Sequence, residues 1–471
     1  MCLFILLGRQ QNIMKQILSR IVDLRNYRWN ELFLLILPSV FILLGMLNLQ
    51  YVSVSNQGKA PSEITASSLP GIDTLGPQLL LIVALFATHI ILSWLIPKAD
   101  QTLLPITGML SALGVLMATR LGPALPYPIP VLGYRQLIWV ILGLVFCIGT
   151  VWFTRSIKWL SRYKYTWAAA GIILVLVSLF HSLRVKNFNS PTHDQLNLGF
   201  GGVVFQPSEL LKLCLVIFFA AYLSENREVL ALGGKKIGPI HIPPLRQSAP
   251  LLAILFISLL LFLGLRELGV ALLIFGIFVS MIYIATNKMS YVLYSLGFFA
   301  GGSLIAYYLL GYIRDRVALV ANAFLPAYAN NTGFQIVQGL IALGAGGIFG
   351  QGLGQGYPYF VPAVQTDYVA AAVGEEFGMM GLFALLAIML LLIYRGFRIA
   401  MRSRSVFEQL LGAGLSSIFA IQTIVILAGN LKLIPLTGIP LPFITYGGSS
   451  VIINFIMVGL LLRLSAPEET A

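Results

Sequence analysis

Apolar residues gather into twelve long segments along this chain, separated for the most part by short polar stretches. A helix needs about 20 apolar residues to cross the hydrocarbon core of a bilayer, and the segments come close to that length. The expected spans lie at about residues 32–50, 77–96, 102–120, 135–153, 165–181, 206–224, 249–265, 268–286, 291–311, 379–397, 409–428 and 446–464. The pattern therefore predicts an all-α, polytopic integral membrane protein with about twelve transmembrane helices.

The composition agrees with this fold class. Hydrophobic residues make up 58% of the 471 residues and charged residues only 10%, whereas a soluble domain carries about 25% charged residues. A water-soluble globule could not cover its core with so few polar groups. A chain this apolar would not stay disordered either. The composition therefore excludes both a soluble globular protein and a disordered one.

The formal net charge of +13 comes from basic residues that cluster on one side of the predicted membrane. The densest clusters lie at 155–164, 227–246 and 395–404. Cytoplasmic loops collect Lys and Arg, so we expect this side and both termini to lie in the cytoplasm. The basic excess then reflects topology, and no nucleic-acid partner is indicated.

One external loop is long, covering residues 312–378 between the ninth and tenth spans. It has apolar residues at helical spacing from Phe334 to Leu343 and eight glycines from Gly339 to Gly356. A long, partly apolar loop of this kind is usually ordered and functional. The glycine run at 350–356 has no βαβ unit around it, so it is no dinucleotide fingerprint. It predicts either a hinge or a concavity of N–H groups for an anion such as a lipid diphosphate.

Ionisable side chains inside a membrane are costly and are functional candidates by default. Glu209 and Lys212 are three residues apart and share a helix face. They predict a structural ion pair or a direct contact to substrate. Arg266 and Glu267 occupy the tight external turn between two spans, where Glu267 would either cap the following helix or line a polar cavity.

The densest group of acidic residues is Asp367 with Glu375 and Glu376, near the outer membrane boundary. A partly desolvated carboxylate there would have a raised proton affinity and could act as a general base. The alternative is a helix cap, because Thr366 and Asp367 are favoured capping types. The four histidines and three cysteines have no metal-ligand spacing, so no metal site can be assigned.

Six motifs along the chain, taken together, are similar to those of one protein family. They are FQPSELLK at 205–212, Leu268-Gly269 after an acidic residue, Arg316-Val317, GFQIVQGLIALGAGGIFGQGLGQG at 333–356, VPAVQTDYVAAAVGEEFG at 361–378 and PLPFITYGGSS at 440–450. The chain resembles the shape, elongation, division and sporulation (SEDS) family, which includes RodA, FtsW and SpoVE. The likeness covers about residues 102–464.

The resemblance implies a ten-helix core formed by the third to twelfth spans. It divides the chain into a segment at 1–101 with a cytoplasmic start and two extra transmembrane helices, a core at 102–464 and a cytoplasmic tail at 465–471. It further implies an enzyme of the bacterial cytoplasmic membrane. This enzyme would be a peptidoglycan glycosyltransferase, which polymerises lipid II into glycan strands at the outer face.

The resemblance also implies residue roles. The essential aspartate of the family maps onto Asp367, which would take the proton from the acceptor sugar's 4-hydroxyl. Substrate contacts would come from a set of polar and charged side chains that includes Gln206, Ser208, Glu209, Lys212, Arg266, Glu267, Arg316, Glu375 and Glu376. Arg316, with Lys212 or Arg266, would stabilise the diphosphate leaving group. No cofactor can be assigned with certainty, and a divalent cation (Mg²⁺ or Mn²⁺) stays open as a helper.

This chain departs from the family pattern at three places: Arg266-Glu267 stands where Pro-Asp is usual, Gln365 stands where His is frequent, and the Arg-Trp that often precedes the Gln-Pro-Ser-Glu motif has no match near Asp194–Gly199. None of these departures touches Asp367. The expected partners are lipid II, membrane lipids and a class B penicillin-binding protein, the transpeptidase that would crosslink the strands.

Two other functions fit the same topology. Twelve spans with inner termini also describe secondary transporters and lipid flippases, although here the charged residues gather toward the outer side instead of the midplane. A non-catalytic scaffold is the third possibility, and it would tolerate replacement of Asp367.

Overall fold

The computed structural model describes residues 27–55, 72–154, 156–184, 198–200, 203–232, 235–237, 240–242 and 245–466. Residues 1–26 and 467–471, within the predicted N-terminal segment and C-terminal tail, lie outside this part. Twelve helices in the described ranges are long and apolar enough to cross a membrane, so the predicted fold class is confirmed.

The first span is α2 (Trp29–Leu34) continued by α3 (Ile36–Ser55). The others are α4 (Ile72–Leu95), α5 (Leu103–Leu121), α6 (Leu132–Phe153), α8 (Lys164–Arg184), α9 (Pro207–Leu232), α10 (Leu245–Gly264), α11 (Leu268–Thr286), α12 (Met289–Leu309), α16 (Val369–Arg402), α17 (Val406–Asn430) and α18 (Gly448–Ser465).

The remaining elements are short. The helices are η2 (Gly122–Ala124), α7 (Lys158–Arg162), α13 (Gly311–Asn322), α14 (Pro326–Ala329), α15 (Phe334–Gly346) and η4 (Pro358–Phe360). The strands β1 (Leu198–Phe200) and β2 (Val203–Phe205) pair antiparallel, as do β3 (Lys235–Ile237) and β4 (Ile240–Ile242).

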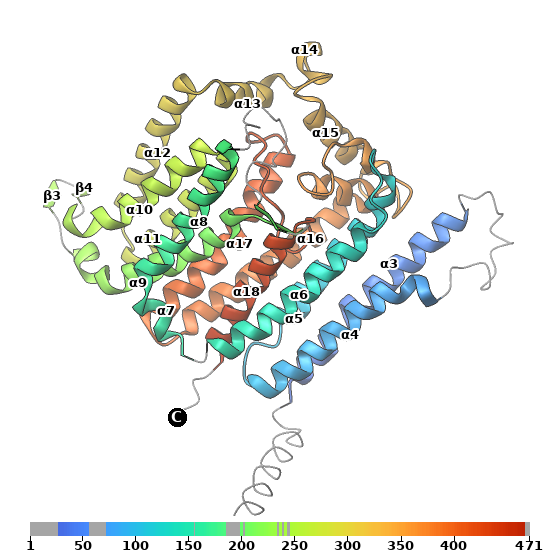
Figure 1. The fold of residues 1–471 in the computed structure, drawn as a ribbon, viewed down its shortest axis with the longest axis horizontal. Coiled ribbons are helices and arrows are strands. Elements are labelled where there is room, and N and C mark those ends of the chain that lie inside the picture. Colours follow the sequence, from blue (N-terminus) through green and yellow to red (C-terminus); the bar gives the residue numbers. More distant parts are fainter. Residues whose placement is uncertain are drawn as a thin grey trace, which may run out of the picture.

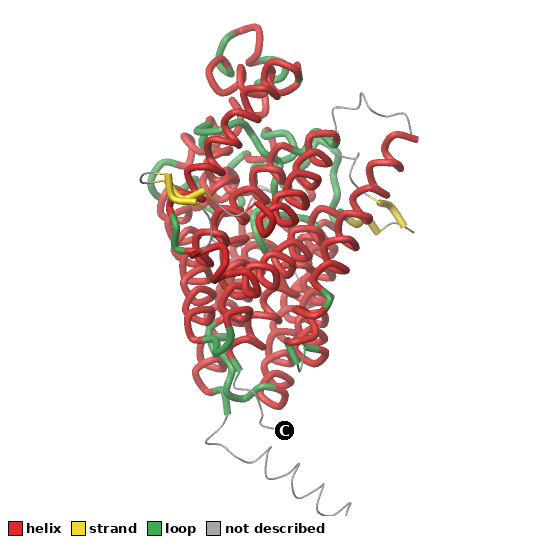
Figure 2. The backbone as a smooth tube through the Cα atoms, turned by 90° about the vertical axis from the view of Figure 1, so that its left-hand side faces the viewer, coloured by secondary structure: helices red, strands yellow, loops and turns green. Residues whose placement is uncertain are grey.

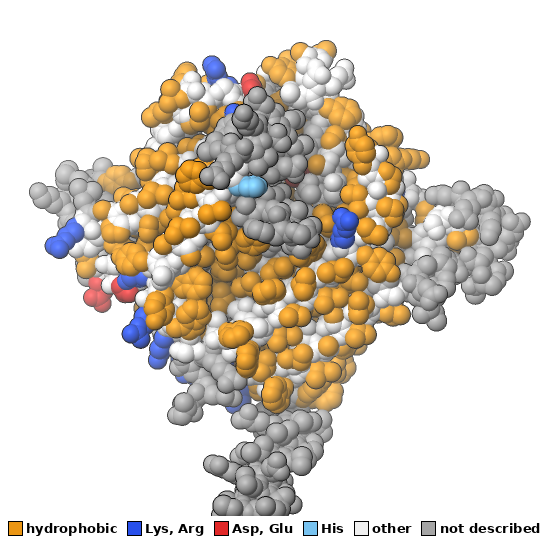
Figure 3. Space-filling model, in the orientation of Figure 1, with side chains coloured by type: hydrophobic (Ala, Val, Ile, Leu, Met, Phe, Trp, Pro, Cys, Tyr) orange, Lys and Arg blue, Asp and Glu red, His pale blue; other side chains and the backbone are white. Residues whose placement is uncertain are grey.

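The spans form one bundle with a buried centre (Figures 1 and 2). The spans α5, α9 and α17 are the most buried, whereas no residue in the apolar window of α12 is buried. Helices α3 and α4 lie against α5 and α6 at one side, and α13 to α15 cover one end. On the face drawn in Figure 3, hydrophobic side chains cover most of the middle, as a surface in contact with lipid requires.

The predicted external loop at 312–378 is largely helical. It contains α13, α14 and α15, the last of which confirms the helical spacing from Phe334. The tenth span starts earlier than predicted, because α16 already begins at Val369 and runs through a kink at Gly378, where φ is 69° and ψ is −170°. The predicted tenth span at 379–397 therefore covers only the part of α16 that follows this kink.

Residues 431–447, between α17 and α18, form an irregular segment that enters the bundle. Ile439, Leu441, Phe443 and Ile444 are each only 1% exposed. Irregular backbone at membrane depth is tolerated only where protein or a water-filled cavity surrounds it. This stretch, which we name the buried segment, therefore depends on the surrounding helices for its hydrogen bonds.

A buried ion pair between Arg28 and Glu31 lies at the start of the N-terminal helices. The Arg28 guanidinium also donates to the carbonyls of Ile96 (3.0 Å) and Asp100 (2.8 Å) in the connection between α4 and α5. His89 on α4 lies 3.3 Å from the second oxygen of Glu31. These contacts fix the position of residues 96–100.

Replacement of Glu31 by Ala should destabilise the protein by about 3–5 kcal/mol, because it leaves the Arg28 charge buried without its carboxylate. Glu31→Gln should be intermediate. Thermal unfolding of the purified protein in detergent measures the effect. The matched control is Glu225→Ala, which removes the partner of Lys164 from a pair in which Glu225 is 54% exposed, and it should change little. Equal losses in Glu31→Ala and the control would contradict the anchoring role.

Candidate active site

Asp367 lies in the turn that leads into α16, and it is buried. The turn is shaped by Ala363, whose φ of 51° lies in the left-handed region. The Ala363 carbonyl accepts hydrogen bonds from the N–H of Asp367 (3.0 Å) and from the hydroxyl of Thr366 (3.1 Å). The N-cap residue of α16 is Tyr368, with no side-chain capping bond. The N-cap position of α16 therefore falls on Tyr368, one residue after Asp367.

Tyr368, the residue after Asp367, anchors this turn in the protein interior. Its ring is fully buried, and it packs against Gly339 of α15 so closely that a Cβ there would clash with it. Burial, and then the neighbouring Asp367 carboxylate, raise the pKa of the Tyr368 hydroxyl. Asp367 is thus fixed between the α15 helix and the start of α16.

The glycine run packs directly onto the α16 kink. At the kink, the N–H groups of Met379 and Met380 donate to the carbonyls of Gly347 (2.9 Å) and Ile348 (3.1 Å). In return, the N–H groups of Gln351 and Gly352 donate to the carbonyls of Glu375 (2.8 Å) and Glu376 (3.0 Å). These N–H groups are therefore occupied, which argues against the anion-binding concavity and assigns the run to close backbone packing.

Glu375 and Glu376 hold the same loop through their side chains. The Tyr357 N–H donates to Glu375 Oε1 at 2.6 Å. Arg120, at the end of α5, pairs with Glu376 at 2.8 Å and donates to the Gly356 carbonyl at 2.8 Å. Both carboxylates thus order the loop that adjoins the Asp367 turn.

The motif at 206–212 begins α9, and its predicted ion pair forms: Lys212 Nζ lies 2.7 Å from Glu209 Oε2, with both side chains almost fully buried. Lys212 also donates to Gln422 of α17 at 3.1 Å, and Gln422 donates to the Pro440 carbonyl of the buried segment. The backbone N–H of Gln206 donates to Ser449 at 2.9 Å. Ser208 is buried, and its hydroxyl has no hydrogen-bond partner among the described residues.

Arg266 and Arg316 both lie beside Tyr312 of α13. The Arg266 guanidinium lies over the Tyr312 ring, 5.6 Å from its centroid. Burial raises the pKa of Tyr312, while the Arg316 and Arg266 charges act in the opposite direction. Glu267 occupies the N-cap position of α11 but makes no side-chain capping bond, and it is buried.

The buried segment connects these parts. Its Leu436 carbonyl accepts a long contact from Arg316 (3.5 Å), and the Tyr446 N–H donates to the Gln365 carbonyl (3.0 Å), two residues before Asp367. A Cβ on Gly269 would clash with Thr437, so the start of α11 also packs on it. The structure therefore arranges the Asp367 turn, the 206–212 motif and Arg316 along one segment.

Two residues in this arrangement had no predicted role. Arg120 is a charged residue at a helix end, and Gln422 is a polar residue in the middle of a span. Charged and polar positions in or beside a span are a usable signal. Arg120 pairs with Glu376 and Gln422 with Lys212, each more than 200 positions away along the chain, and no local pattern reveals such a pairing.

Among the described residues, no three Asp, Glu, His or Cys side chains come together as a metal site. Glu375 and Glu376 are engaged by Tyr357 and Arg120, as described above. The described side chains thus form no ready-made cation cage.

Comparison with known proteins gives consistent matches. The model of the cell cycle protein family FtsW/RodA/SpoVE matches residues 101–470. The peptidoglycan glycosyltransferase RodA of Mycobacterium tuberculosis is 34% identical over 447 residues, covering 92% of this chain and 90% of the relative. The probable peptidoglycan glycosyltransferase FtsW of Geobacter metallireducens is 34% identical over 271 residues, covering 56% of this chain and 68% of the relative.

The fold also matches a solved chain from a peptidoglycan synthase complex, described for its coordination of polymerization and crosslinking. The TM-score is 0.61 at 24% identity, covering 78% of this chain and 97% of that one. The mycobacterial match covers a larger share of this chain than residues 101–470 do. Part of the N-terminal region is therefore shared with that relative.

Gly350→Ala should destabilise the protein by about 1–3 kcal/mol, because Gly350 has φ of 85° and a Cβ would clash with the Glu376 carbonyl. Hydrogen–deuterium exchange should rise at residues 347–352 and 375–380. The control is Gly344→Ala on α15, where a Cβ meets nothing within 4 Å, and it should be neutral or slightly stabilising. A stable Gly350→Ala variant with unchanged exchange would contradict the packing role.

Proposed function

The chain belongs to the FtsW/RodA/SpoVE family of cell cycle proteins, and from that membership we propose how it works as a peptidoglycan glycosyltransferase of the membrane. Its substrate is lipid II, a disaccharide–peptide linked through diphosphate to a polyprenyl lipid. The observation that carries the proposal is that the Asp367 turn and Arg316 contact the buried segment directly, and the 206–212 motif contacts it through Gln422, beside an apolar groove.

Asp367 is the general base. It takes the proton from the 4-hydroxyl of the acceptor sugar while this oxygen attacks the anomeric carbon of the donor and the diphosphate leaves, with inversion at that carbon. The turn fixed by Ala363 and Tyr368 supplies the rigid support that a base requires.

The apolar groove takes the polyprenyl chain. One apolar cavity of about 790 Å³ lies between α10, α11 and α12 and reaches from Ser248 to Phe298. A second, of about 420 Å³, reaches Val317 and Thr437. The two share Phe256, Leu259 and Phe298, so they form one groove along α10 and α12. Val317 and Leu436 line one end of this groove. Arg316 precedes Val317 in the chain and contacts the Leu436 carbonyl, so it lies beside this end.

The arginines at the end of this groove neutralise the negative charge of the diphosphate. Arg316 and Arg266 both neighbour Tyr312, and positive charge there would favour departure of the leaving group. Lys212 is assigned a structural role instead, because its charge is already matched by Glu209. Glu375 and Glu376 are assigned to ordering the glycine loop.

The end of the bundle that holds Asp367 faces the exterior in this proposal, and both termini face the cytoplasm. The opposite end has Lys98, Lys158, Arg398, Arg402 and Arg404 in one cavity, as expected for a cytoplasmic face. We further propose that a class B penicillin-binding protein crosslinks the strands. The similar chain of known structure comes from a synthase complex that coordinates these two steps.

Asp367→Asn should lower lipid II polymerisation by about 100-fold or more, since general-base catalysis contributes about 10²–10⁴-fold. The assay is gel separation of the glycan products formed by purified protein from labelled lipid II. The control is Asp315→Asn, which removes an exposed acid on α13 and should leave the rate unchanged. An Asp367→Asn enzyme that folds and polymerises like the parent would disprove the assignment.

Ala306→Trp should raise KM for lipid II several-fold with a smaller change in kcat, because the indole would occupy the groove beside Ile313 and Val317. The matched control is Leu304→Trp on the same helix, where the side chain is 58% exposed on the bundle surface. Steady-state kinetics of the purified variants measures both KM and kcat. Equal KM values for both variants would place the lipid chain elsewhere.

A further inference from the structure

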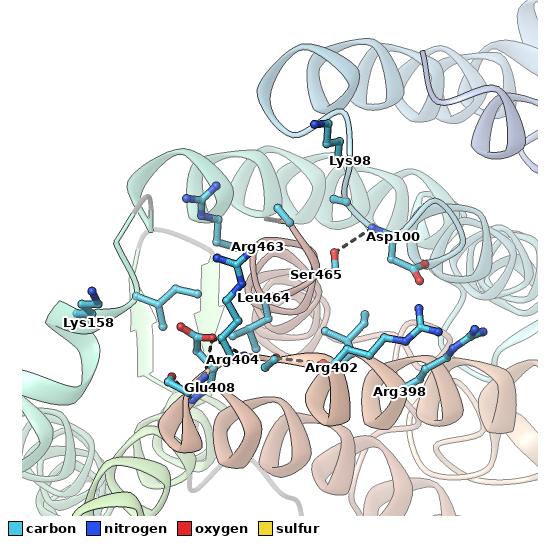
Figure 4. A pocket seen from close by; sticks show the side chains of 16 residues that line it. Lys98, Asp100, Lys158, Arg398, Arg402, Arg404, Glu408, Arg463, Leu464 and Ser465 are labelled. Atoms are coloured by element: carbon cyan, nitrogen blue, oxygen red, sulfur yellow. Dashed lines mark hydrogen bonds between the residues drawn. The ribbon is translucent and has the colours of Figure 1, made fainter. Parts of the chain in front are cut away.

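A cavity of about 530 Å³ lies at the end of the bundle opposite Asp367. It is formed where the α4–α5 connection, α7, the α16–α17 connection and the end of α18 meet (Figure 4). Six basic side chains line it: Lys98, Lys158, Arg398, Arg402, Arg404 and Arg463. The catalytic proposal uses none of them.

The two acidic residues in the lining offset only part of this charge, and both have other partners. Asp100 Oδ1 accepts from the N–H (2.8 Å) and hydroxyl (2.6 Å) of Thr102, and its Oδ2 pairs with Arg395, outside the lining. Glu408 forms a capping box with Ser405 at the start of α17. Within the described residues, the side chains of Lys98, Lys158, Arg398, Arg402 and Arg404 have no ion-pair partner.

The cavity wall is rigid on the side built by the N-terminal helices. Arg28 holds the carbonyls of Ile96, Ala99 and Asp100, and the Asp100 N–H donates to Ser465 of α18 at 2.9 Å. The position of Lys98 is therefore set by the extra helices and the core together.

The chemistry of the lining indicates a phosphate group. Arginine forks and lysines bind phosphate oxygens by charge-assisted hydrogen bonds. Apolar residues share the lining, namely Ile157, Ile399 and Leu464. The half-exposed Trp152 and Trp159 lie on neighbouring elements, and tryptophans gather at membrane interfaces. A ligand with both a phosphate and an apolar part fits this mixture.

We propose that this cavity binds the phosphate headgroup of an anionic phospholipid from the cytoplasmic leaflet. Basic pockets between transmembrane helices on this side are suited to such headgroups. The inference depends on the membrane orientation proposed above, and it is independent of the role of Asp367.

The experiment is native mass spectrometry of the purified full-length protein, with phosphatidylglycerol and phosphatidylcholine of equal chain length added in turn. The test variant is Arg398→Gln with Arg402→Gln, and neither side chain has a hydrogen bond within the described part of the chain. Arg463 is left in place, because its Nε donates to the Thr154 carbonyl at 3.2 Å. The matched control is Arg162→Gln with Lys288→Gln, two basic residues on the same side but outside the lining.

The parent should retain phosphatidylglycerol in preference to phosphatidylcholine, and the test variant should bind it about tenfold more weakly. The control should bind like the parent, and thermal unfolding of both variants should match it. Equal loss in test and control variants would overturn the proposal in favour of general surface charge. Equal retention of phosphatidylcholine by the parent would overturn it as well.

Competition with soluble anions distinguishes a lipid headgroup from a soluble phosphate compound as the ligand of this cavity. Inorganic phosphate and glycerol 3-phosphate should displace phosphatidylglycerol only at millimolar concentrations, because they lack the apolar part. Displacement at micromolar concentrations would assign the cavity to a soluble phosphate compound and overturn the lipid assignment.

Discussion

The need to satisfy backbone hydrogen bonds away from water governs this structure, and the buried segment at 431–447 shows it most clearly. Each unpaired backbone group in an apolar interior costs free energy comparable to a lost hydrogen bond. Gln422 donates to the Pro440 carbonyl, and the Thr445 hydroxyl accepts from the Leu441 N–H at 2.8 Å. The backbone at Phe443 takes φ of 66°, which only tight surroundings can enforce. The side chains that satisfy the segment thereby hold the candidate site together.

The same requirement explains the α16 kink. A helix broken at Gly378 frees carbonyls before the break and N–H groups after it, and the loop at 347–352 supplies the partners for both. This exchange needs close backbone approach, so glycine at 350 and 378 is a geometric necessity. The kink lies about three turns after Asp367 in the sequence, so the loop and its glutamates stabilise the helix start that follows Asp367, the proposed base.

Length and hydropathy were enough to predict the twelve spans, because a bilayer imposes one helix length on every crossing. The Glu209–Lys212 pair followed from its spacing alone. The early start of α16 could not be predicted in this way. Residues 369–378 are buried against the glycine loop, and their small and acidic side chains lower the local hydropathy. The buried segment also escaped prediction: Pro435, Gly438 and Pro440 end the helical pattern, but nothing local indicates that the chain then turns inward. Nor does any local signal pair Lys212 with Gln422.

The membrane setting also decides where binding energy for a lipid-linked sugar can arise. Moving a polyprenyl chain from the bilayer into the α10–α12 groove gains little hydrophobic free energy, because the surrounding lipid is as apolar as the groove. The exposed α12 leaves this groove open at the side. The groove can therefore orient the chain without holding it tightly. Affinity must come from the polar end, where two arginines flank Tyr312 and charge-assisted contacts to a diphosphate are strong. In the proposed mechanism, this arrangement would let the polyprenyl chain leave after each transfer, because only the headgroup is bound tightly.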